Sequence, residues 1–296
     1  MDALNPLFAD SKGRQIAQPD LGGSGVADTH AHLDMLEDPA LALARAATAG
    51  VRFIATVADV TEDAWRTYDE LSSWLANARE MLDAAGRADL QPPSVRVVVG
   101  AHPHNAKEWG PEQEAEFRRL VAHDLTCAVG EMGLDYHYDH SPRDVQRDRF
   151  ATHLALAHEF LLPAVVHLRE AHEDGLAILR EGGIPAAGCI LHCFNLGPDI
   201  MEPFLELGCH VSFAGPATFK KADEVRESAR VVPVGRLLTE TDCPFMAPEP
   251  FRGRTNEPAL VVFTAAALAT ARSESAGAFA AHTLSAALDL LDGDRS

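Results

Sequence analysis

The amino-acid sequence predicts an α/β fold, a (β/α)8 TIM barrel. From Val26 onward, short apolar runs alternate with segments of helical periodicity. Several of these runs are continuous and rich in β-branched residues, which is typical of parallel strands buried on both faces. The alternation repeats eight times over roughly 270 residues, as this barrel requires. A doubly wound open sheet is the alternative, but no glycine-rich phosphate-binding loop follows the first run.

The individual elements follow from the same alternation. Strands are expected at residues 26–27, 51–58, 95–100, 127–131, 164–167, 188–192, 209–213 and 237–241. Helices are expected at residues 39–49, 62–85, 111–122, 143–160, 171–181, 198–207, 221–231 and 258–271. Gly50 closes the first helix and Pro198 lies in the first turn of a later one, positions that these residue types favour.

The chain is expected to form one large domain. Residues 1–25 are rich in glycine, proline and aspartate without a sustained period, so we expect a loose N-terminal tail. Residues 26–296 are expected to form a single barrel domain. Residues 59–94, a helix plus a loop around Gln91-Pro92-Pro93, are the longest departure from the alternation, and we interpret them as an extended insertion.

Side chains that can bind metals lie at the carboxyl ends of the predicted strands. His30 and His32 are two residues apart, so an extended backbone directs both imidazoles to one side. Four more such residues end later strands: Glu131, His167, His192 and Asp242. This end of the barrel carries active sites, and such groups are rarely buried unpaired. The pattern therefore predicts a metal centre.

The set of ligands suits two divalent ions. The predicted first site consists of His30, His32 and Asp242, the second of His167 and His192, with Glu131 between them. A carboxylate can bridge two ions because it has two oxygens to share. Nitrogen and carboxylate ligands suit Zn²⁺ or Mn²⁺, whereas Mg²⁺ prefers more oxygen. We therefore expect two ions of Zn, Mn or Mg.

Catalytic roles are expected for Asp242, as the group that takes a proton from the attacking water, and for the bridging Glu131. His102 is a candidate for a hydrogen bond to substrate, and the alternative is that it caps the turn before Pro103. The candidate substrate-binding residues are cations near the active face, which can bind phosphate or lie on the surface as solvated charges. They are Arg169, Arg252, Arg254 and Lys220, followed by Lys221.

The composition is that of an ordinary globular protein, with 47% hydrophobic residues and a mean hydropathy of -0.08. No apolar run of about 18 residues and no basic, apolar leader are present, so we expect a cytoplasmic location. The five cysteines form no Cys-x-x-Cys pair, which favours buried free thiols. Cys193 and Cys243 adjoin predicted ligands, and we expect their side chains to point away from the metal centre.

The net charge of -19 argues against a broad basic surface for duplex nucleic acid. A small pocket that holds metal ions can still admit the end of one strand, because the ions supply positive charge locally. A duplex-binding surface and a membrane are therefore not expected among the partners, whereas nucleic-acid ends as substrate stay compatible with this charge. A monomer is the working assumption for the oligomeric state.

From Asp28 to about Ala271 the sequence resembles the TatD family of metal-dependent hydrolases. The segments that carry the resemblance are Asp-Thr-His-Ala-His-Leu-Asp (28–34), Gly-Ala-His-Pro-His (100–104), Gly-Glu-Met-Gly-Leu-Asp-Tyr (130–136), Val-His-Leu-Arg-Glu-Ala (166–171), Leu-His-Cys-Phe (191–194), Thr-Glu-Thr-Asp-Cys-Pro-Phe (239–245) and Arg-Gly-Arg-Thr-Asn-Glu-Pro (252–258). Leu168 departs from the family, which often has serine there, and residues 59–94 look long.

The resemblance implies a TIM barrel and a metal-dependent deoxyribonuclease, typically a 3′-5′ exonuclease. It implies ligand roles for His30, His32, Glu131, His167, His192 and Asp242, in agreement with the assignment from the strand ends.

Three alternatives remain open from the sequence. One is an amidohydrolase or lactonase, whose paired metals are often bridged by a carboxylated lysine after the fourth strand, where this chain has Glu131 and no lysine. Another is a deacylase for the aminoacyl ester of tRNA. The third is a metal-stabilised barrel that binds a partner without catalysis, and it predicts a closed coordination shell.

Overall fold

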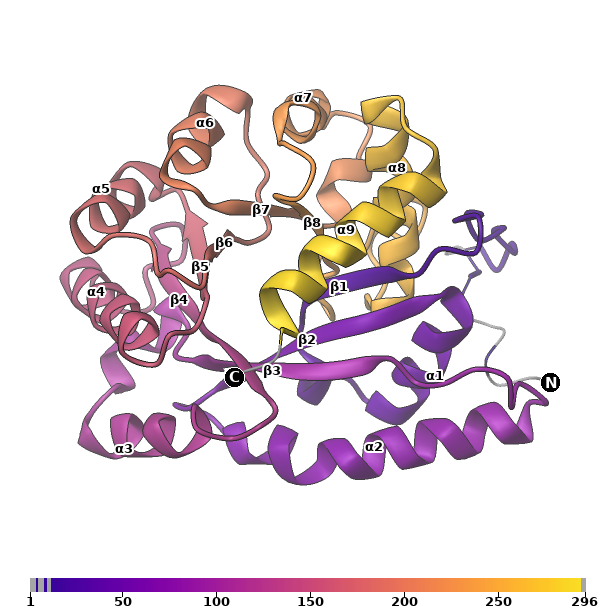
Figure 1. Cartoon of the computed structure of the whole chain (residues 1–296), viewed down its shortest axis with the longest axis horizontal. Helices are drawn as coiled ribbons and strands as arrows, with labels where there is room; N and C mark the ends of the chain where they lie inside the picture. The colour runs from indigo at the N-terminus through magenta and orange to yellow at the C-terminus, as the bar shows by residue number, and fades with distance from the viewer. Residues whose placement is uncertain (1–3, 5–7, 10–11, 294–296) are drawn as a thin grey trace.

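The computed structural model describes the chain except for residues 1–3, 5–7, 10–11 and 294–296. Eight parallel strands form one sheet in chain order, so each strand pairs with the next (Figure 1). The strands are β1 (Val26–Ala31), β2 (Val51–Asp59), β3 (Ser94–Gly100), β4 (Thr126–Asp135), β5 (Ala164–Arg169), β6 (Cys189–Leu191), β7 (His210–Phe213) and β8 (Leu237–Thr239). The predicted (β/α)8 TIM barrel is confirmed.

The barrel closes where the segment after β8 meets β1. The backbone N–H of Asp242 donates to the carbonyl of His30, and the N–H of His32 donates to the carbonyl of Cys243, both at 2.9 Å. Ala31 and Cys243 are also parallel bridge partners. Closure therefore brings Asp242 beside His30 and His32, although these residues lie near opposite ends of the chain.

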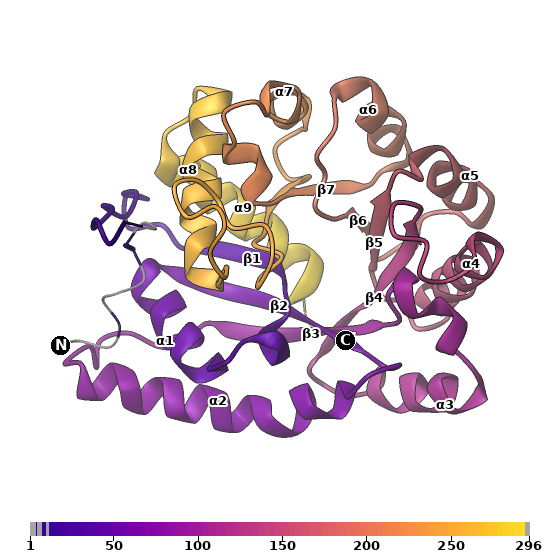
Figure 2. The ribbon, with the colours of Figure 1, turned by 180° about the vertical axis from the view of Figure 1, so that it is seen from behind.

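Helices surround the sheet (Figures 1 and 2). The α-helices are α1 (Pro39–Ala49), α2 (Ala64–Ala84), α3 (Pro111–Leu120), α4 (Arg143–Glu159), α5 (His172–Gly182), α6 (Pro198–Leu207), α7 (Asp223–Val231), α8 (Val261–Arg272) and α9 (Ala276–Leu291). Short 3-10 helices are η1 (Leu33–Met35), η2 (Pro103–Glu108), η3 (Gly215–Thr218) and η4 (Pro258–Leu260). Within the described residues, no helix has the length and apolar character needed to cross a bilayer.

Helix α1 shows how local signals set these boundaries. Asp38 begins it, because its side chain accepts a hydrogen bond from the backbone N–H of Leu41. Gly50 ends it in the left-handed conformation with a φ of 93°, which a residue without Cβ adopts at low cost. The end that the sequence predicts at Gly50 is the observed one.

The segment 59–94, which we expected to be an extended insertion, contains the 21-residue helix α2. It packs against α1 and β2, so it covers the sheet in the same way as the other crossover helices. The loop after it leads directly into β3. The added length of this segment therefore resides mainly in a long helix of the barrel itself.

Helix α9 was not among the predicted helices. Ser275 caps it, accepting a hydrogen bond from the N–H of Ala278. Its last turns place Ala287 and Leu291 in a cluster with inward-facing strand residues such as Phe53 and Val98. The same turns line a cavity at the beginnings of β3, β4 and β5. Helix α9 therefore covers the barrel end opposite the strand carboxyl ends.

The described part of residues 1–25, where we expected a loose tail, contacts the barrel. The ring of Phe8 lies 5.7 Å from that of Phe263 and 6.5 Å from that of Phe251. Leu21 is 6% exposed. The rest of the expected tail, at residues 1–3, 5–7 and 10–11, lies outside the described residues, and the division into one domain stays a prediction.

Candidate metal centre

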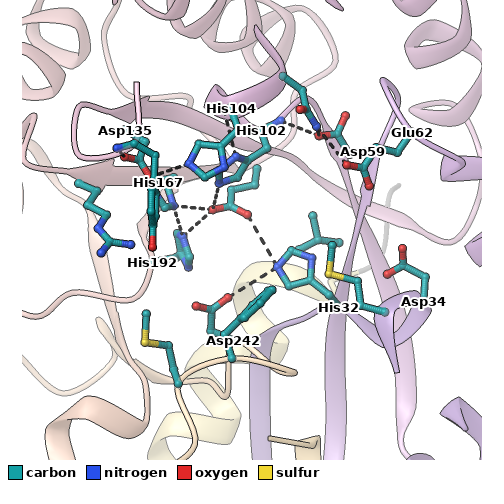
Figure 3. A pocket seen from close by; sticks show the side chains of 18 residues that line it. His32, Asp34, Asp59, Glu62, His102, His104, Asp135, His167, His192 and Asp242 are labelled. Carbon is teal, nitrogen blue, oxygen red and sulfur yellow. Dashed lines mark hydrogen bonds and ion pairs between the residues drawn. The ribbon is translucent and has the colours of Figure 1, made fainter. Parts of the chain in front are cut away.

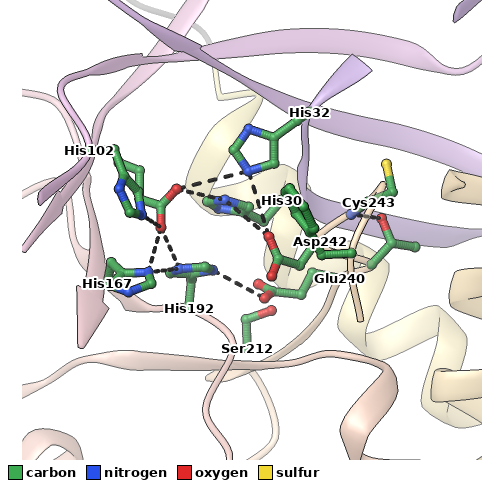
Figure 4. Close-up of polar contacts among 12 residues, drawn as sticks. His30, His32, His102, His167, His192, Ser212, Glu240, Asp242 and Cys243 are labelled. Atoms are coloured by element: carbon green, nitrogen blue, oxygen red, sulfur yellow. Dashed lines mark hydrogen bonds and ion pairs between the residues drawn. The ribbon is translucent and has the colours of Figure 1, made fainter. Parts of the chain in front are cut away.

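The six predicted ligands converge at the carboxyl ends of the strands (Figure 4). Glu131 lies in β4 and is 3% exposed. The imidazoles come from β1, β5 and the residues that follow β1 and β6, and the second carboxylate follows β8. These residues are His30, His32, His167, His192 and Asp242.

Glu131 contacts imidazoles through both of its oxygens. Its Oε1 atom lies 2.7 Å from Nδ1 of His167 and 2.8 Å from Nε2 of His192. Its Oε2 atom lies 3.2 Å from Nε2 of His30 and 4.0 Å from Nε2 of His32. This carboxylate therefore lies between two groups of nitrogen ligands, the position that the sequence predicts for a bridging ligand.

The first group consists of His30, His32 and Asp242, whose ligand atoms all lie within 4.8 Å of one another. Oδ1 of Asp242 lies 3.6 Å from Nε2 of His32 and 4.0 Å from Nε2 of His30. Ligands that share an ion at about 2.1 Å lie roughly 3–4 Å apart, so these spacings fit one divalent ion.

The second group is the predicted pair. Nδ1 of His167 lies 3.1 Å from Nε2 of His192. His102 lies beside this pair, with its Nε2 atom 3.5 Å from Oε1 of Glu131.

The polar atoms of the centre fit metal ions. Both ring nitrogens of His30 are buried without a hydrogen-bond partner in the structure, a costly state unless a ligand satisfies them. Burial raises the pKa of Glu131, but the nearby imidazoles of His192, His102 and His30 outweigh it and hold that pKa well below its usual value. A carboxylate kept ionised among imidazoles is the donor set expected of Zn²⁺ or Mn²⁺.

The backbone around the centre is shaped for close approach. A Cβ atom on Gly130 would lie 2.7 Å from the carbonyl oxygen of Val165, so a side chain there would displace β4 from β5. Asp242 has a φ of 56°, a left-handed conformation that aspartate tolerates better than most residues. This conformation, together with its hydrogen bond to His30, turns the Asp242 carboxylate toward the first group.

Three carboxylates behind the ligands were not among the predicted site residues. Glu240 is fully buried, and its Oε1 atom lies 3.2 Å from Nδ1 of His192. Asp135 accepts from Nε2 of His104 at 2.8 Å and lies 3.4 Å from Nε2 of His167. Hydrogen bonds of this kind orient metal-ligating imidazoles.

The third of these carboxylates is Asp28, which accepts from the Thr241 backbone N–H at 2.8 Å and from its hydroxyl at 2.6 Å. Burial raises the pKa of Asp28 to about 8. It holds Thr241, which follows β8 and immediately precedes Asp242. A sequence signal exists for it and for Glu240, because each is an acidic residue two positions before a predicted ligand.

His102 occupies both of its expected positions, turn cap and pocket wall. Its Nδ1 atom accepts a hydrogen bond from the N–H of His104 at 3.1 Å and so caps η2. That bond assigns the ring proton to Nε2, the atom that faces Glu131. Burial lowers the pKa of His102 to about 3, so the ring is neutral at pH 7. His102 is therefore a hydrogen-bond donor toward the centre.

The five cysteines are free, in agreement with the prediction. Cys243 is fully buried, and its thiol interacts with the side chain of Thr241 and the backbone of His32. Cys193 differs from the expectation that its side chain points away, because its thiol interacts with the carboxylate of Asp242. Its backbone φ of 49° breaks the strand alternation on which that expectation depends.

A pocket of about 350 Å³ opens beside the two groups (Figure 3). Arg169 lines it, as predicted for a substrate contact, and its guanidinium lies 4.7 Å from the ring centre of Tyr138. The other predicted substrate contacts are absent from its lining. Arg252 lies over the ring of Phe219, and Lys220 is exposed. Arg254 donates a hydrogen bond to the carbonyl of Ala9.

This combination of barrel, histidine groups and bridging carboxylate can be compared with known proteins. The family model described as TatD related DNase matches residues 27–292. The chain belongs to this family.

Its relatives have matching descriptions. The chain is 43% identical over 175 residues to the uncharacterized metal-dependent hydrolase YabD of Bacillus subtilis, which covers 59% of this chain and 69% of that protein. It is 36% identical over 205 residues to the 3'-5' ssDNA/RNA exonuclease TatD of Pantoea vagans, which covers 68% of this chain and 79% of that protein. The crystal structure of YJJV, a TatD homologue of Escherichia coli, matches with a TM-score of 0.76 and 27% identity, covering 91% of this chain and 98% of that one.

These comparisons confirm the predicted class, a metal-dependent hydrolase, and the predicted divalent-metal cofactor. Which ion binds stays a prediction.

Proposed function

We propose that this member of the TatD family is a 3′-5′ exonuclease that hydrolyses phosphodiester bonds at the ends of single-stranded nucleic acid, DNA above all. The observation that carries the proposal is the position of Glu131, 2.7 Å from His167 on one side and 3.2 Å from His30 on the other. A carboxylate shared by two ions suits phosphodiester hydrolysis. The name of the Pantoea relative supports the same substrate class.

Two ions at this centre would polarise the phosphodiester and make water a better nucleophile. Asp242 would accept the proton of that water, since a carboxylate is ionised at neutral pH and Asp242 borders the pocket. His102 would donate its Nε2 proton to a phosphate oxygen. Arg169 would pair with the phosphate of the adjoining nucleotide, because it is a cation in the pocket wall.

The pocket supports action at chain ends. Its volume of about 350 Å³ is near the lower limit of ligand pockets, roughly 300–1,000 Å³, and suits one nucleotide. The net charge of -19 opposes binding along a duplex. A substrate is therefore expected to enter by its terminal nucleotide, with the rest of the strand outside.

The other hydrolase classes receive less support. The lysines of this chain are Lys12, Lys107, Lys220 and Lys221, so the carboxylated lysine after β4 of many amidohydrolases has no counterpart here. The open pocket beside the ligands is the opposite of the closed shell expected of a purely structural metal site. The tRNA deacylase alternative, the monomeric state and the cytoplasmic location stay predictions.

The first test is the Glu131→Gln variant on a 5′-labelled single strand with Mg²⁺, Mn²⁺ or Zn²⁺. The native protein is expected to give a ladder that shortens from the 3′ end, and the variant is expected to lose about 1,000-fold or more of this rate, because it lacks the shared carboxylate. Glu173→Gln, an exposed carboxylate on α5, is the matched control. Equal cleavage by native protein and Glu131→Gln would show that the assigned site is wrong.

A further inference from the structure

Exposed apolar side chains gather at the mouth of the metal pocket. Phe245 is 53% exposed, Tyr138 is 50% exposed and Met35 is 47% exposed, and all three line the pocket. Large apolar side chains exposed around a cavity mark a binding surface for an apolar group. A polar, metal-lined pocket with such a rim fits a ligand that has both an anionic and a flat apolar part.

Phe245 and Tyr138 approach the pocket from opposite sides. Tyr138 follows β4 and Phe245 follows β8, and these strands are four positions apart in the closed barrel of eight. Phe245 is therefore on the side of the first metal group, where its ring lies 6.3 Å from His32. Tyr138 is on the side of the second group, with its ring 5.4 Å from His104.

The two rings differ in the contacts they already have. Tyr138 is stacked on His140 at 5.5 Å with an interplanar angle of 3°, and the guanidinium of Arg169 lies over the same ring. In the described part of the chain, the ring contact of Phe245 is an edge contact with His32. Among the described residues no aromatic ring is stacked on Phe245, which is half exposed, whereas Tyr138 is already stacked.

The backbone holds Phe245 in place. Its N–H donates to the carbonyl of Asp242 at 2.9 Å, and its own carbonyl accepts from the side-chain amide of Asn256 at 2.7 Å. Asn256 is fully buried, so the loop between β8 and η4 is anchored from beneath. Phe245 is three residues beyond Asp242, and because its backbone is held at both its N–H and its carbonyl, little backbone freedom is lost when a ligand stacks on its ring.

The charged residues of the pocket lining come from different strands, and Figure 3 labels Asp34, Asp59 and Glu62 among them. The carboxylates of Asp34, Asp59 and Glu62 line it after β1 and at and after the end of β2, and β1 adjoins β8 in the closed barrel. Arg169 lines it at the end of β5, the neighbour of β4. Among the described lining residues Arg169 alone is an arginine or lysine, so a further phosphate is expected to bind on the side of β5. The neutral base of the last nucleotide suits the Phe245 side, and the remaining strand suits the other.

We propose that Phe245 is the stacking platform for the nucleobase of the terminal nucleotide. This inference rests on the proposed exonuclease function and assigns its terminal-base subsite. Base stacking on an aromatic side chain is tolerant of sequence, so the subsite would accept any base and reject an end without one.

The test pairs a change in the enzyme with a change in the substrate. Single strands with a normal or an abasic 3′-terminal residue are cleaved by the native protein, Phe245→Ala and Tyr138→Ala, and kcat/KM is measured. The native protein is expected to cleave the abasic end about ten-fold more slowly. Phe245→Ala is expected to have a kcat/KM about ten-fold below that of the native protein on the normal end. On the abasic end its kcat/KM is expected to equal that of the native protein. Tyr138→Ala is expected to keep the ten-fold discrimination. Full discrimination by Phe245→Ala would overturn the proposal.

A binding measurement separates this proposal from the proposed function. A strand with 2-aminopurine at its 3′ end and a methylene phosphonate in its last linkage is added to the metal-loaded protein. Stacking is expected to quench its fluorescence with the native protein and with Leu161→Ala, a control whose side chain is 76% exposed outside the metal pocket. Quenching that survives in Phe245→Ala, or that is absent with the native protein, contradicts the assignment whether or not normal strands are cleaved.

Discussion

His192 lies between two carboxylates, each of which contacts one of its two ring nitrogens. Nδ1 lies 3.2 Å from Oε1 of the fully buried Glu240, and Nε2 lies 2.8 Å from Oε1 of Glu131. A carboxylate behind a ligating imidazole holds the proton on the rear nitrogen and leaves the lone pair of the other nitrogen for the metal. The position of one proton therefore decides whether Nε2 of His192 can bind a metal, and Glu240 holds that proton on Nδ1.

The Glu240→Gln variant is expected to bind metal about 10- to 100-fold more weakly than the native protein, because the amide no longer holds the His192 proton on Nδ1 as a carboxylate does. Calorimetric titration of the metal-free protein with Zn²⁺ or Mn²⁺ measures the change. Glu206→Gln, an exposed position on α6, is the control. Unchanged affinity in Glu240→Gln would assign Glu240 a purely structural role.

At the scale of elements, packing of α4 against α3 buries His153 and lowers its pKa, which the sequence does not indicate. His153 on α4 is fully buried, with its ring 4.3 Å from that of Trp109 and 6.0 Å from that of Phe117 on α3. Burial lowers its pKa to about 4. The neutral ring therefore acts as a core side chain between α3 and α4.

This burial predicts an acid-sensitive step in stability. The folded-state pKa of His153 is lower than its ordinary value of 6.5, so the unfolded chain binds more protons between pH 6.5 and about 4. The contribution of His153 is complete above pH 6.5 and is lost as the pH falls toward 4, by up to about 1.4 kcal/mol per pH unit.

The His153→Leu variant is expected to lose less free energy of unfolding than the native protein between pH 7 and pH 5, measured by urea denaturation with a chelator present. His158→Leu, at an exposed position on the same helix, is the control. Parallel pH profiles for the native protein and His153→Leu would contradict the prediction.

At the scale of the whole molecule, the metal centre links strands from both ends of the chain. Glu131 in β4 faces His30 from β1, and Asp242 after β8 faces His32 after β1. Ions held at these residues would bind the folded barrel but not the extended chain. Their binding free energy therefore adds to the stability of the closed fold.

Removal of metal by a chelator is expected to lower Tm, and addition of two equivalents of metal is expected to restore it. At a free metal concentration about 100 times Kd, the gain is about 2.7 kcal/mol. Differential scanning calorimetry of the two forms measures it, with the Glu131→Gln variant as a control that should respond much less. An unchanged Tm would argue against two ions at the assigned ligands.

How much the sequence alone revealed differs between elements. The strands and eight helices were predictable because apolar runs and helical periods alternate regularly from Val26. Helix α9 was not predicted. The eight strand–helix units were already complete before it, and this alanine-rich helix is followed by no further strand. The contact of Phe8 with Phe263 was not predicted either. No local pattern in a glycine- and proline-rich segment indicates which of its apolar residues packs against the barrel.

The sequence by itself determined the barrel and the end of it at which six ligand-type residues gather, because parallel strands bring their carboxyl ends together. That these six residues bind the metal stays a prediction. Only the tertiary structure decided the finer chemistry. It placed Arg169 at the pocket and Arg252, Arg254 and Lys220 elsewhere, and it set the hydrogen bonds that direct His102 and His192. Side-chain direction in loops and the proton position on an imidazole depend on partners distant in the chain, which no local pattern records.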